Sequence, residues 1–409
     1  MNKNYLTIHS LIALPWHNLN RDDRGLPKQM TEGGVVKGVL SAQSQKRAMR
    51  TQYELAVATE DHKVETGSKR SKLMAAEAVK RAGKMAIDLA QKAAKEAGRS
   101  FDEKSVIFNS DEARKRAEKA ISALVKKPET GSDKKKKGNA KQEVDGADAE
   151  QPVDANGPSA SADSTDVAVW LGDDEINSLA KALLNPTGDI AGTEFILKPV
   201  GSLAIAAFGR MFAKAPTLQT EAAIAVGSAI TTHAINLEVD YFTTKDDLTS
   251  GGAAFLGQAF YTSGVYYRTV TIDKAQLKRT WAAWKSTESK NLLTELVRAL
   301  VLALPDGKNN STAPKTLPSL ILAETQQHRV NYAFASPVPA AEVGGYLQPS
   351  MEALINLADI GRKFDKTQFG GAFVSGTALG TPSAPNIPFE HKRGDLSALV
   401  DYVISWLCS

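Results

Sequence analysis

Cysteine is nearly absent from this 409-residue chain, because Cys408, next to the end of the sequence, is the single one. One thiol cannot form a disulfide within the chain or supply a cysteine-based metal site. Such thiol usage is typical of a reducing cytoplasm. The sequence also lacks a run of about 18 uncharged apolar residues and a signal-type apolar core near its start. We therefore expect a cytoplasmic protein that does not enter the membrane.

A strong excess of charge of either sign is absent as well. The 50 Lys and Arg residues face 46 Asp and Glu residues, which leaves a net charge of +4. Any nucleic-acid site must therefore be a local concentration of cations rather than a property of the whole surface. The length predicts two or three structural lobes.

Motifs for catalysis are missing too. The sequence has no G-x-x-x-x-G-K-[ST], no G-x-G-x-x-G after a predicted strand, and no G-x-S-x-G. Asp22 and Asp23 are neighbours and could hold a divalent metal only if further ligands converged on them. No metal-ligand spacing links the histidines considered, which are His9, His17, His233, His328 and His391. We therefore predict a protein that is not an enzyme and that has no metal or cofactor.

The most informative local pattern lies between residues 41 and 50. An amide and three cations recur at i, i+3, i+4 and i+7, and these residues are Gln43, Lys46, Arg47 and Arg50. At helical pitch they form one stripe, while Ala42, Met49 and Tyr53 fall on the other side. Such a face suits a phosphate backbone, although a merely solvated basic face has the same pattern.

The order of predicted elements indicates an α+β fold. Strands are predicted at 4–14, 195–211, 265–272, 320–323 and 330–335. Helices are predicted at 173–184, 286–304, 350–364 and 396–407, and a helical region spans 68–127 with Asn109 and Glu112 as a capping pair. Residues 221–233 fit a helix or a strand, and 234–263 suit a projecting arm. A small antiparallel sheet of the kind found in RNA-recognition folds fits this order.

Composition changes abruptly between residues 126 and 166. Lys134 to Lys137 form a basic run, and acidic residues then follow among Gly, Pro, Ser and Ala. This segment is predicted to be a disordered insert with segregated charges. Either it is a loop extension without a role, or its lysines contact a nucleic acid transiently.

Several short segments together resemble one known family. They are residues 19–23, 41–50, 209–211, 229–233, 240–248, 263–268 and 347–350, including Leu-Asn-Arg-Asp-Asp and Ser-Gly-Val-Tyr-Tyr-Arg. In this order they resemble the CasC backbone subunits of the type I-E CRISPR surveillance complex, Cascade, which belong to the wider RAMP superfamily. Residues 60–200 match mainly by position.

The resemblance implies a hand-shaped α+β protein. Its RNA-recognition-like (ferredoxin-like) palm is expected at 1–59, 200–230 and 264–409. Helical fingers are expected at 60–199, with the disordered charged insert at 127–166, and a thumb arm at 231–263. Copies are expected to polymerise head to tail along one CRISPR RNA with other Cascade subunits. The resulting ribonucleoprotein filament presents the guide to invading DNA in antiviral defence, and a recruited helicase-nuclease cuts that DNA.

The same resemblance assigns roles to individual residues. The expected RNA contacts are Asn20, Arg21, Gln43, Lys46, Arg47, Arg50, Arg210 and Met211. The expected thumb and base-stacking residues are Tyr241, Phe242 and Leu256. Relatives carry a lysine-dense fingers helix thought to guide DNA, whereas residues 173–184 contain one cation. The possible DNA contacts here are Lys134, Lys135, Lys136, Lys137 and Lys181.

Two catalytic alternatives stay open at this point. The first is a metal-dependent RNase of the same superfamily, which would cut target RNA with Asp22 or Asp23. The second is a guide-processing endonuclease, for which His17 is the candidate.

Overall fold

The computed structural model describes residues 3–58, 67–125, 167–185, 190, 193–245, 247 and 253–409. It divides into two compact units. The sheet unit contains Met1–Asp61, Ile224–Ala275 and Ser289–Ser409, and the helical unit contains His62–Ala223 and Gln276–Glu288. Residues 200–223, expected in the palm, thus belong to the helical unit, and the arm at 231–263 belongs to the sheet unit. The charged insert at 127–166 lies outside the described residues.

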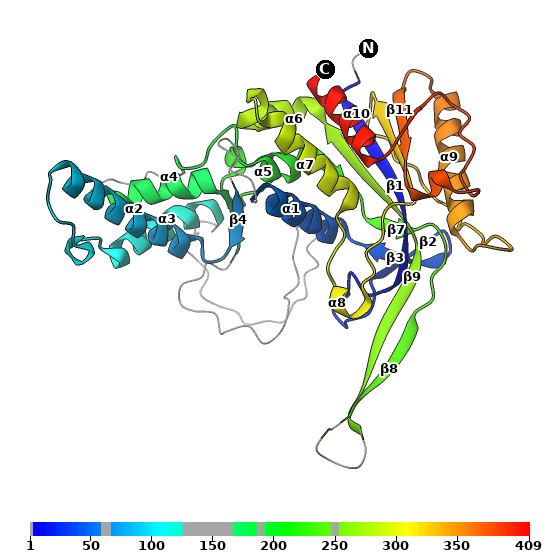
Figure 1. Ribbon diagram of the computed structural model, residues 1–409, viewed down its shortest axis with the longest axis horizontal. Coiled ribbons are helices and arrows are strands. Elements are labelled where there is room, and N and C mark those ends of the chain that lie inside the picture. Colours follow the sequence, from blue (N-terminus) through cyan, green and yellow to red (C-terminus); the bar gives the residue numbers. More distant parts are fainter. Residues whose placement is uncertain are drawn as a thin grey trace, which may run out of the picture. The chain divides into compact units, whose positions relative to one another are not determined.

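A long, mainly antiparallel sheet forms the centre of the sheet unit (Figure 1). In spatial order its strands are β12 (Lys392–Arg393), β11 (Phe369–Ser375), β10 (Leu320–Gln326), β1 (Tyr5–His17), β9 (Ala253–Asp273), β7 (Ala229–Thr231), β3 (Val35–Leu40) and β2 (Gln29–Glu32). β6 (Ile224–Val226) and β8 (Glu238–Lys245) also pair with β9. Only the β11–β12 pair is parallel among these strands.

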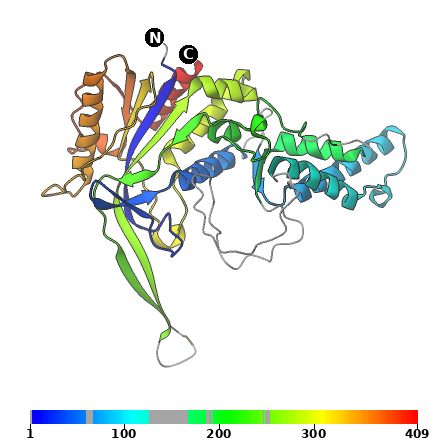
Figure 2. The ribbon, with the colours of Figure 1, turned by 180° about the vertical axis from the view of Figure 1, so that it is seen from behind.

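Both faces of this sheet are covered, which explains the nearly continuous apolar run in β1. On one face, Leu11 and Leu322 pack against Met351 and Leu354 of α9 (Leu347–Phe364). On the opposite face, Ile12 packs in a cluster with neighbours from β3, β7 and β9. Helices α1 (Ala42–Ala58), α7 (Ser289–Leu302) and α10 (Leu396–Cys408) pack among themselves and on the sheet, and α6 (Lys274–Thr280) and α8 (Asn309–Thr312) are short. The reverse view shows α9 beside β11 (Figure 2).

The arm grows out of the central sheet as a hairpin. β8 pairs with the first half of β9, from Glu238↔Tyr261 outward to Lys245↔Ala253, and the second half of β9 then continues between β1 and β7. One strand therefore serves both the arm and the core, so the base of the arm is anchored in the sheet.

The helical unit has its own apolar core. α2 (Met74–Glu96), α3 (Ser110–Val125) and α4 (Asp173–Leu184) meet through small side chains such as Ala78, Ala82 and Ala117, all of them buried. A small antiparallel sheet of β4 (Ser68–Ser71) and β5 (Val169–Gly172) lies beside them. As predicted, Asn109 and Glu112 cap α3, because Asn109 Oδ1 accepts a hydrogen bond from the Glu112 backbone N–H at 3.1 Å.

The structure confirms the α+β class and corrects two elements. Residues 195–211 do not form a strand but contain α5 (Leu203–Phe208), in which every residue is buried. A short run that is apolar throughout fits a buried strand or a buried helix equally well, so periodicity could not separate them. Residues 330–335 lie outside the sheet, and β11 takes the position beside β10 instead. The segment 221–233, which fits a helix or a strand by its sequence, contains the strands β6 and β7.

Candidate nucleic-acid interface

Helix α1 is held firmly at its start by side chains from three parts of the sheet unit. The Ser41 backbone N–H donates to Asn20 Oδ1 at 2.8 Å, and the Ala42 N–H donates to Ser228 Oγ at 3.3 Å. The buried amide of Gln45 donates to the carbonyl oxygens of Leu40 and Gly227. These contacts satisfy backbone donors that a helix start leaves unpaired and fix the helix against the sheet.

The outer side of α1 carries the predicted stripe. Met49 and Tyr53 are fully buried, whereas Gln43 and Arg47 are exposed and Lys46 is half-buried. Burial of one side thus turns Gln43, Lys46 and Arg47 toward solvent, with Gln43 in the first helical turn. We call Gln43, Lys46, Arg47 and Arg50 the α1 face.

Glu54 modifies this face in a way that the spacing did not reveal. Arg50 Nε lies 3.7 Å from Glu54 Oε2 on the next helical turn, and both side chains are partly exposed. A pair of this kind is weak in water. It orients the Arg50 guanidinium and reduces the local positive charge, so Glu54 belongs to the description of the site. An acid four residues after an arginine is the sequence signal for such a pair.

The loop before α1 is shaped by its own polar side chains. Arg21 is exposed, and Asn20 Oδ1 is occupied by the helix start, so Asn20 also has a positioning role. Asp22 Oδ1 accepts from the backbone N–H groups of Arg24 and Leu26, each at 2.9 Å. One carboxylate oxygen of Asp22 is therefore committed to the turn, and Asp23 is exposed.

Arg210, which was predicted to contact RNA, lies in the interior of the helical unit. Arg210 is 6 % exposed, and its guanidinium forms a two-pronged ion pair with buried Glu175, with Nη2 donating to Oε1 at 2.6 Å and Nη1 donating to Oε2. Leaving this pair to contact RNA would strand a buried carboxylate, which is costly. The neighbouring Met211 is 69 % exposed in the helical unit and keeps its expected accessibility.

The arm places the two aromatic residues that were expected to stack on bases on opposite faces. Tyr241 and Phe242 are successive residues of β8, and successive strand residues point to opposite faces. Tyr241 shares one face with exposed Leu256, whose cross-strand partner is Thr243. Phe242 lies on the other face over Gly257 and near Phe255, with ring centroids 6.1 Å apart.

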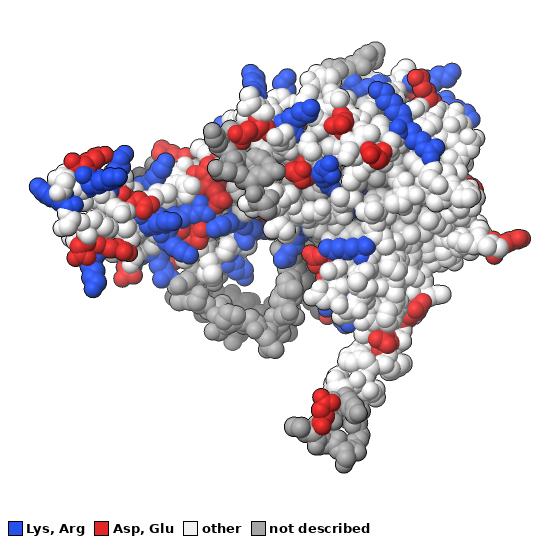
Figure 3. Space-filling view, viewed as in Figure 1, with Lys and Arg blue, Asp and Glu red and all other residues white. Residues whose placement is uncertain are grey.

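Glycine at position 257 makes room for Phe242. A Cβ atom at Gly257 would lie 2.4 Å from Phe242 Cζ, so no other residue fits beneath the ring without a shift. The visible side of the arm shows acidic side chains and no basic ones among the described residues (Figure 3). On this side the arm is thus acidic, unlike the α1 face.

The possible DNA contacts fall into two groups. Lys134, Lys135, Lys136 and Lys137 lie outside the described residues. Lys181 is exposed on α4, in the helical unit. Basic and acidic side chains are mixed over α2 and α3 in the same view (Figure 3).

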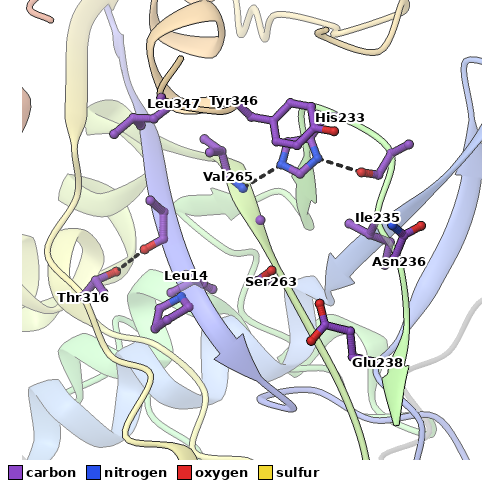
Figure 4. Close-up of a pocket in the computed structure, with 15 residues that line it drawn as sticks. Leu14, His233, Ile235, Asn236, Glu238, Ser263, Val265, Thr316, Tyr346 and Leu347 are labelled. Atoms are coloured by element: carbon purple, nitrogen blue, oxygen red, sulfur yellow. Dashed lines mark hydrogen bonds between the residues drawn. The ribbon is translucent and has the colours of Figure 1, made fainter. Parts of the chain in front are cut away.

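A pocket of about 550 Å³ lies beside the base of the arm (Figure 4). His233 and Tyr346 stack in its wall, with ring centroids 3.6 Å apart. His233 Nε2 accepts from the Val265 backbone N–H, and Nδ1 donates to the Ala234 carbonyl oxygen. Burial, followed by the nearby Lys37 charge, lowers the pKa of His233. Both ring nitrogens serve the backbone, so the ring is a neutral wall element.

Other titratable groups are buried in the core. Tyr332 and Arg362 both donate to buried Glu324, each at 2.6 Å, and His9 Nε2 lies 3.6 Å from it. Burial lowers the pKa of His17 to about 4, and its Nδ1 accepts from the Leu19 N–H. His17 is therefore not placed in an open site. Within the described ranges, no group of three or more His, Cys, Asp or Glu side chains is arranged to hold a metal.

The antiparallel sheet, the helical unit and the projecting arm define the class of fold seen in CRISPR surveillance complexes. A chain of a "CRISPR RNA-guided surveillance complex, pre-nicking" has a TM-score of 0.72 and 22% identity, with 98% of this chain and 99% of that chain covered. A chain of a "CRISPR RNA-guided surveillance complex" has a TM-score of 0.61 and 20% identity, with the same coverage.

The sequence places the chain within a family. A model described as "CT1975-like protein" matches residues 6–402, and the chain belongs to that family. A search of curated proteins gives no match. Of the helices described, none combines the length and the apolar character needed to cross a membrane.

Proposed function

We propose that the protein is a CRISPR RNA-binding backbone subunit of a type I-E surveillance complex, related to CasC. Copies polymerise head to tail along one guide, together with other Cascade subunits, and present it for pairing with invading DNA. The subunit itself is not an enzyme, and a recruited helicase-nuclease completes the reaction in the cytoplasm. The fold shared with chains of surveillance complexes supports this assignment.

The α1 face is the observation that most directly supports the proposal. Its buried side and the capped start hold the helix rigidly, so the backbone that carries the cations is fixed before RNA arrives. Arginine forks match phosphate oxygens, and contacts to phosphates carry no sequence information. A holder of guides with many different sequences needs this indifference to sequence. The exposed apolar residues of the arm suit base stacking or contact with the next copy.

Binding of labelled single-stranded CRISPR RNA across several salt concentrations tests the proposal. The variant Lys46→Ala/Arg47→Ala/Arg50→Ala should lose affinity. The magnitude of the slope of log affinity against log salt concentration, called the salt slope, should fall by about 2, or about 0.7 for each lost phosphate contact. The matched control is Lys92→Ala/Lys95→Ala/Lys104→Ala, which removes the same charge from exposed positions of the helical unit. An unchanged slope in the α1 variant contradicts the role of this face.

Two further measurements separate the proposal from its alternatives. Native mass of the protein with a long guide should show several copies on one RNA. Incubation with complementary RNA and Mg²⁺ should give no periodic cuts. Cuts that disappear in Asp22→Ala or Asp23→Ala would instead establish the RNase alternative.

A further inference from the structure

Trp16 is a large aromatic residue at the base of the arm that none of the roles above uses. Its indole is 38 % exposed and lies on Tyr261, with ring centroids 3.9 Å apart and an interplanar angle of 33°. Tyr261 itself is only 6 % exposed. One ring face of Trp16 is thus supported by a buried ring, which limits its motion.

A β-bulge sets the direction of Trp16. Leu14 pairs with Gly264 and His17 pairs with Thr262, so three steps along β1 oppose two along β9. The extra residue interrupts the ladder, and Pro15, which has no N–H, fits such an interruption. Bulges of this kind re-aim side chains, and here the buried residues Leu14 and His17 fix the bulge on both sides.

A cation flanks the same ring pair. Lys308 Nζ lies 5.1 Å from the Tyr261 ring centroid, and Lys308 has a φ of 48°, which is unusual for a residue with a side chain. The preceding Gly307 donates its N–H to the Leu19 carbonyl oxygen, and a Cβ there would lie 2.3 Å from that oxygen. The loop is therefore held tightly against the segment that follows Trp16. Within the described part of the chain, Lys308 forms no ion pair.

The same segment leads directly to the α1 face. Leu19 holds Gly307, and the next residue, Asn20, holds the start of α1 through the Ser41 N–H. We propose that Trp16, supported by Tyr261 and flanked by Lys308, is a base-stacking platform for single-stranded RNA that adjoins the α1 face. An aromatic face accepts any base, and the ammonium suits the adjoining phosphate. This inference rests on the proposed function, since it adds a base contact to a phosphate grip.

The test uses the full chain with oligoadenylate RNA and with an oligomer of the same length that contains abasic positions. Trp16→Ala should weaken binding of oligoadenylate roughly tenfold and leave the salt slope unchanged, because a stacking contact releases no counterions. Trp16→Phe should restore most of the affinity. Lys308→Ala should lower the slope by about 0.7. On abasic RNA the wild type and Trp16→Ala should bind alike. Melting temperatures of all variants report on folding.

The outcomes distinguish failure of the Trp16 platform from failure of the proposed function. If Trp16→Ala binds oligoadenylate as tightly as the wild type, the platform is overturned, while loss of binding in the α1 variant still supports the proposed function. If Trp16→Ala weakens abasic and normal RNA equally, or weakens only the association of copies, a base-stacking role is overturned as well. If the wild type binds no RNA at all, both inferences fall.

Discussion

The outer face of α1 and the interior of the helical unit both hold cations, but they use them in opposite ways. On α1, exposed Arg47 and half-buried Lys46 face solvent from a helix whose other side is packed. In the helical unit, Arg210 is enclosed, and its two Nη groups donate to Glu175 and the Trp170 carbonyl oxygen. A cation in the sequence is therefore a candidate ligand contact only where packing leaves its donors facing water.

Arg268 of the sheet unit is a second example of a buried cation. The residue is 1 % exposed, and its guanidinium donates to the carbonyl oxygens of Ala303, at 2.7 Å, and Val301, at the end of α7. Burial lowers its pKa to about 10, which leaves it charged at neutral pH. It serves as a cap for helix carbonyls, as cations near helix ends do.

The largest effect is expected when the buried pair is broken. Glu175→Ala leaves Arg210 as an unpaired buried charge and also removes the acceptor for the Gly172 and Leu197 N–H groups. We expect a loss of about 3–5 kcal/mol in the free energy of unfolding of the helical unit, measured by urea denaturation. The double variant Glu175→Ala/Arg210→Met should recover part of this loss. If the double variant is less stable than the single one, the unpaired charge of Arg210 is not the cause of the loss.

Acid should destabilise the sheet unit through its buried histidines. Burial lowers the pKa values of His9 and His17 to about 4 from 6.5, so below pH 6.5 the unfolded chain binds more protons than the folded one. Stability is therefore complete above pH 6.5 and falls as the pH decreases toward 4. From pH 6.5 to 5.5 the two sites together should cost about 2 kcal/mol. Unfolding curves at several pH values should show this slope, and His17→Gln should remove about half of it.

The two faces of the arm should respond differently to truncation. Phe242→Ala removes a ring that packs over Gly257 and near Phe255, so the hairpin should lose about 1 kcal/mol of local stability, visible as faster amide exchange between residues 255 and 261. Tyr241→Ala removes an exposed ring and should leave exchange nearly unchanged while weakening RNA binding or assembly. Equal exchange rates in the two variants would contradict the assignment of faces.

The smallest effect on stability is expected on the α1 face itself. Arg47→Ala should change the free energy of unfolding by no more than about 0.5 kcal/mol, because the side chain is exposed. Its salt slope for RNA should nevertheless fall by about 0.7. Arg210→Met should show the reverse, with lower stability and the same slope. If Arg47→Ala unfolds the protein as Glu175→Ala does, the contrast between the two regions fails.

Local pattern was sufficient for several elements and for the α1 face. Spacing predicted which side of residues 41–50 is buried, because Met49 and Tyr53 recur at helical pitch. The β1 strand and helix α4 were also predicted from their periodicity and their boundary residues, and the arm from its many acids and glycines. The strand predicted at 195–211 was wrong, because the wholly apolar stretch Leu203–Phe208 has no polar face that would distinguish a helix from a strand.

The sequence by itself determined the α+β class and the cationic stripe and indicated a projecting arm, since these depend on neighbours along the chain. Only the tertiary structure decided that Arg210 pairs with Glu175, that Tyr241 and Phe242 serve opposite faces of a paired strand, and that Trp16 rests on Tyr261 beside Lys308. Such contacts join residues that are far apart in the sequence. Their energies depend on burial and geometry, which no spacing along the chain encodes.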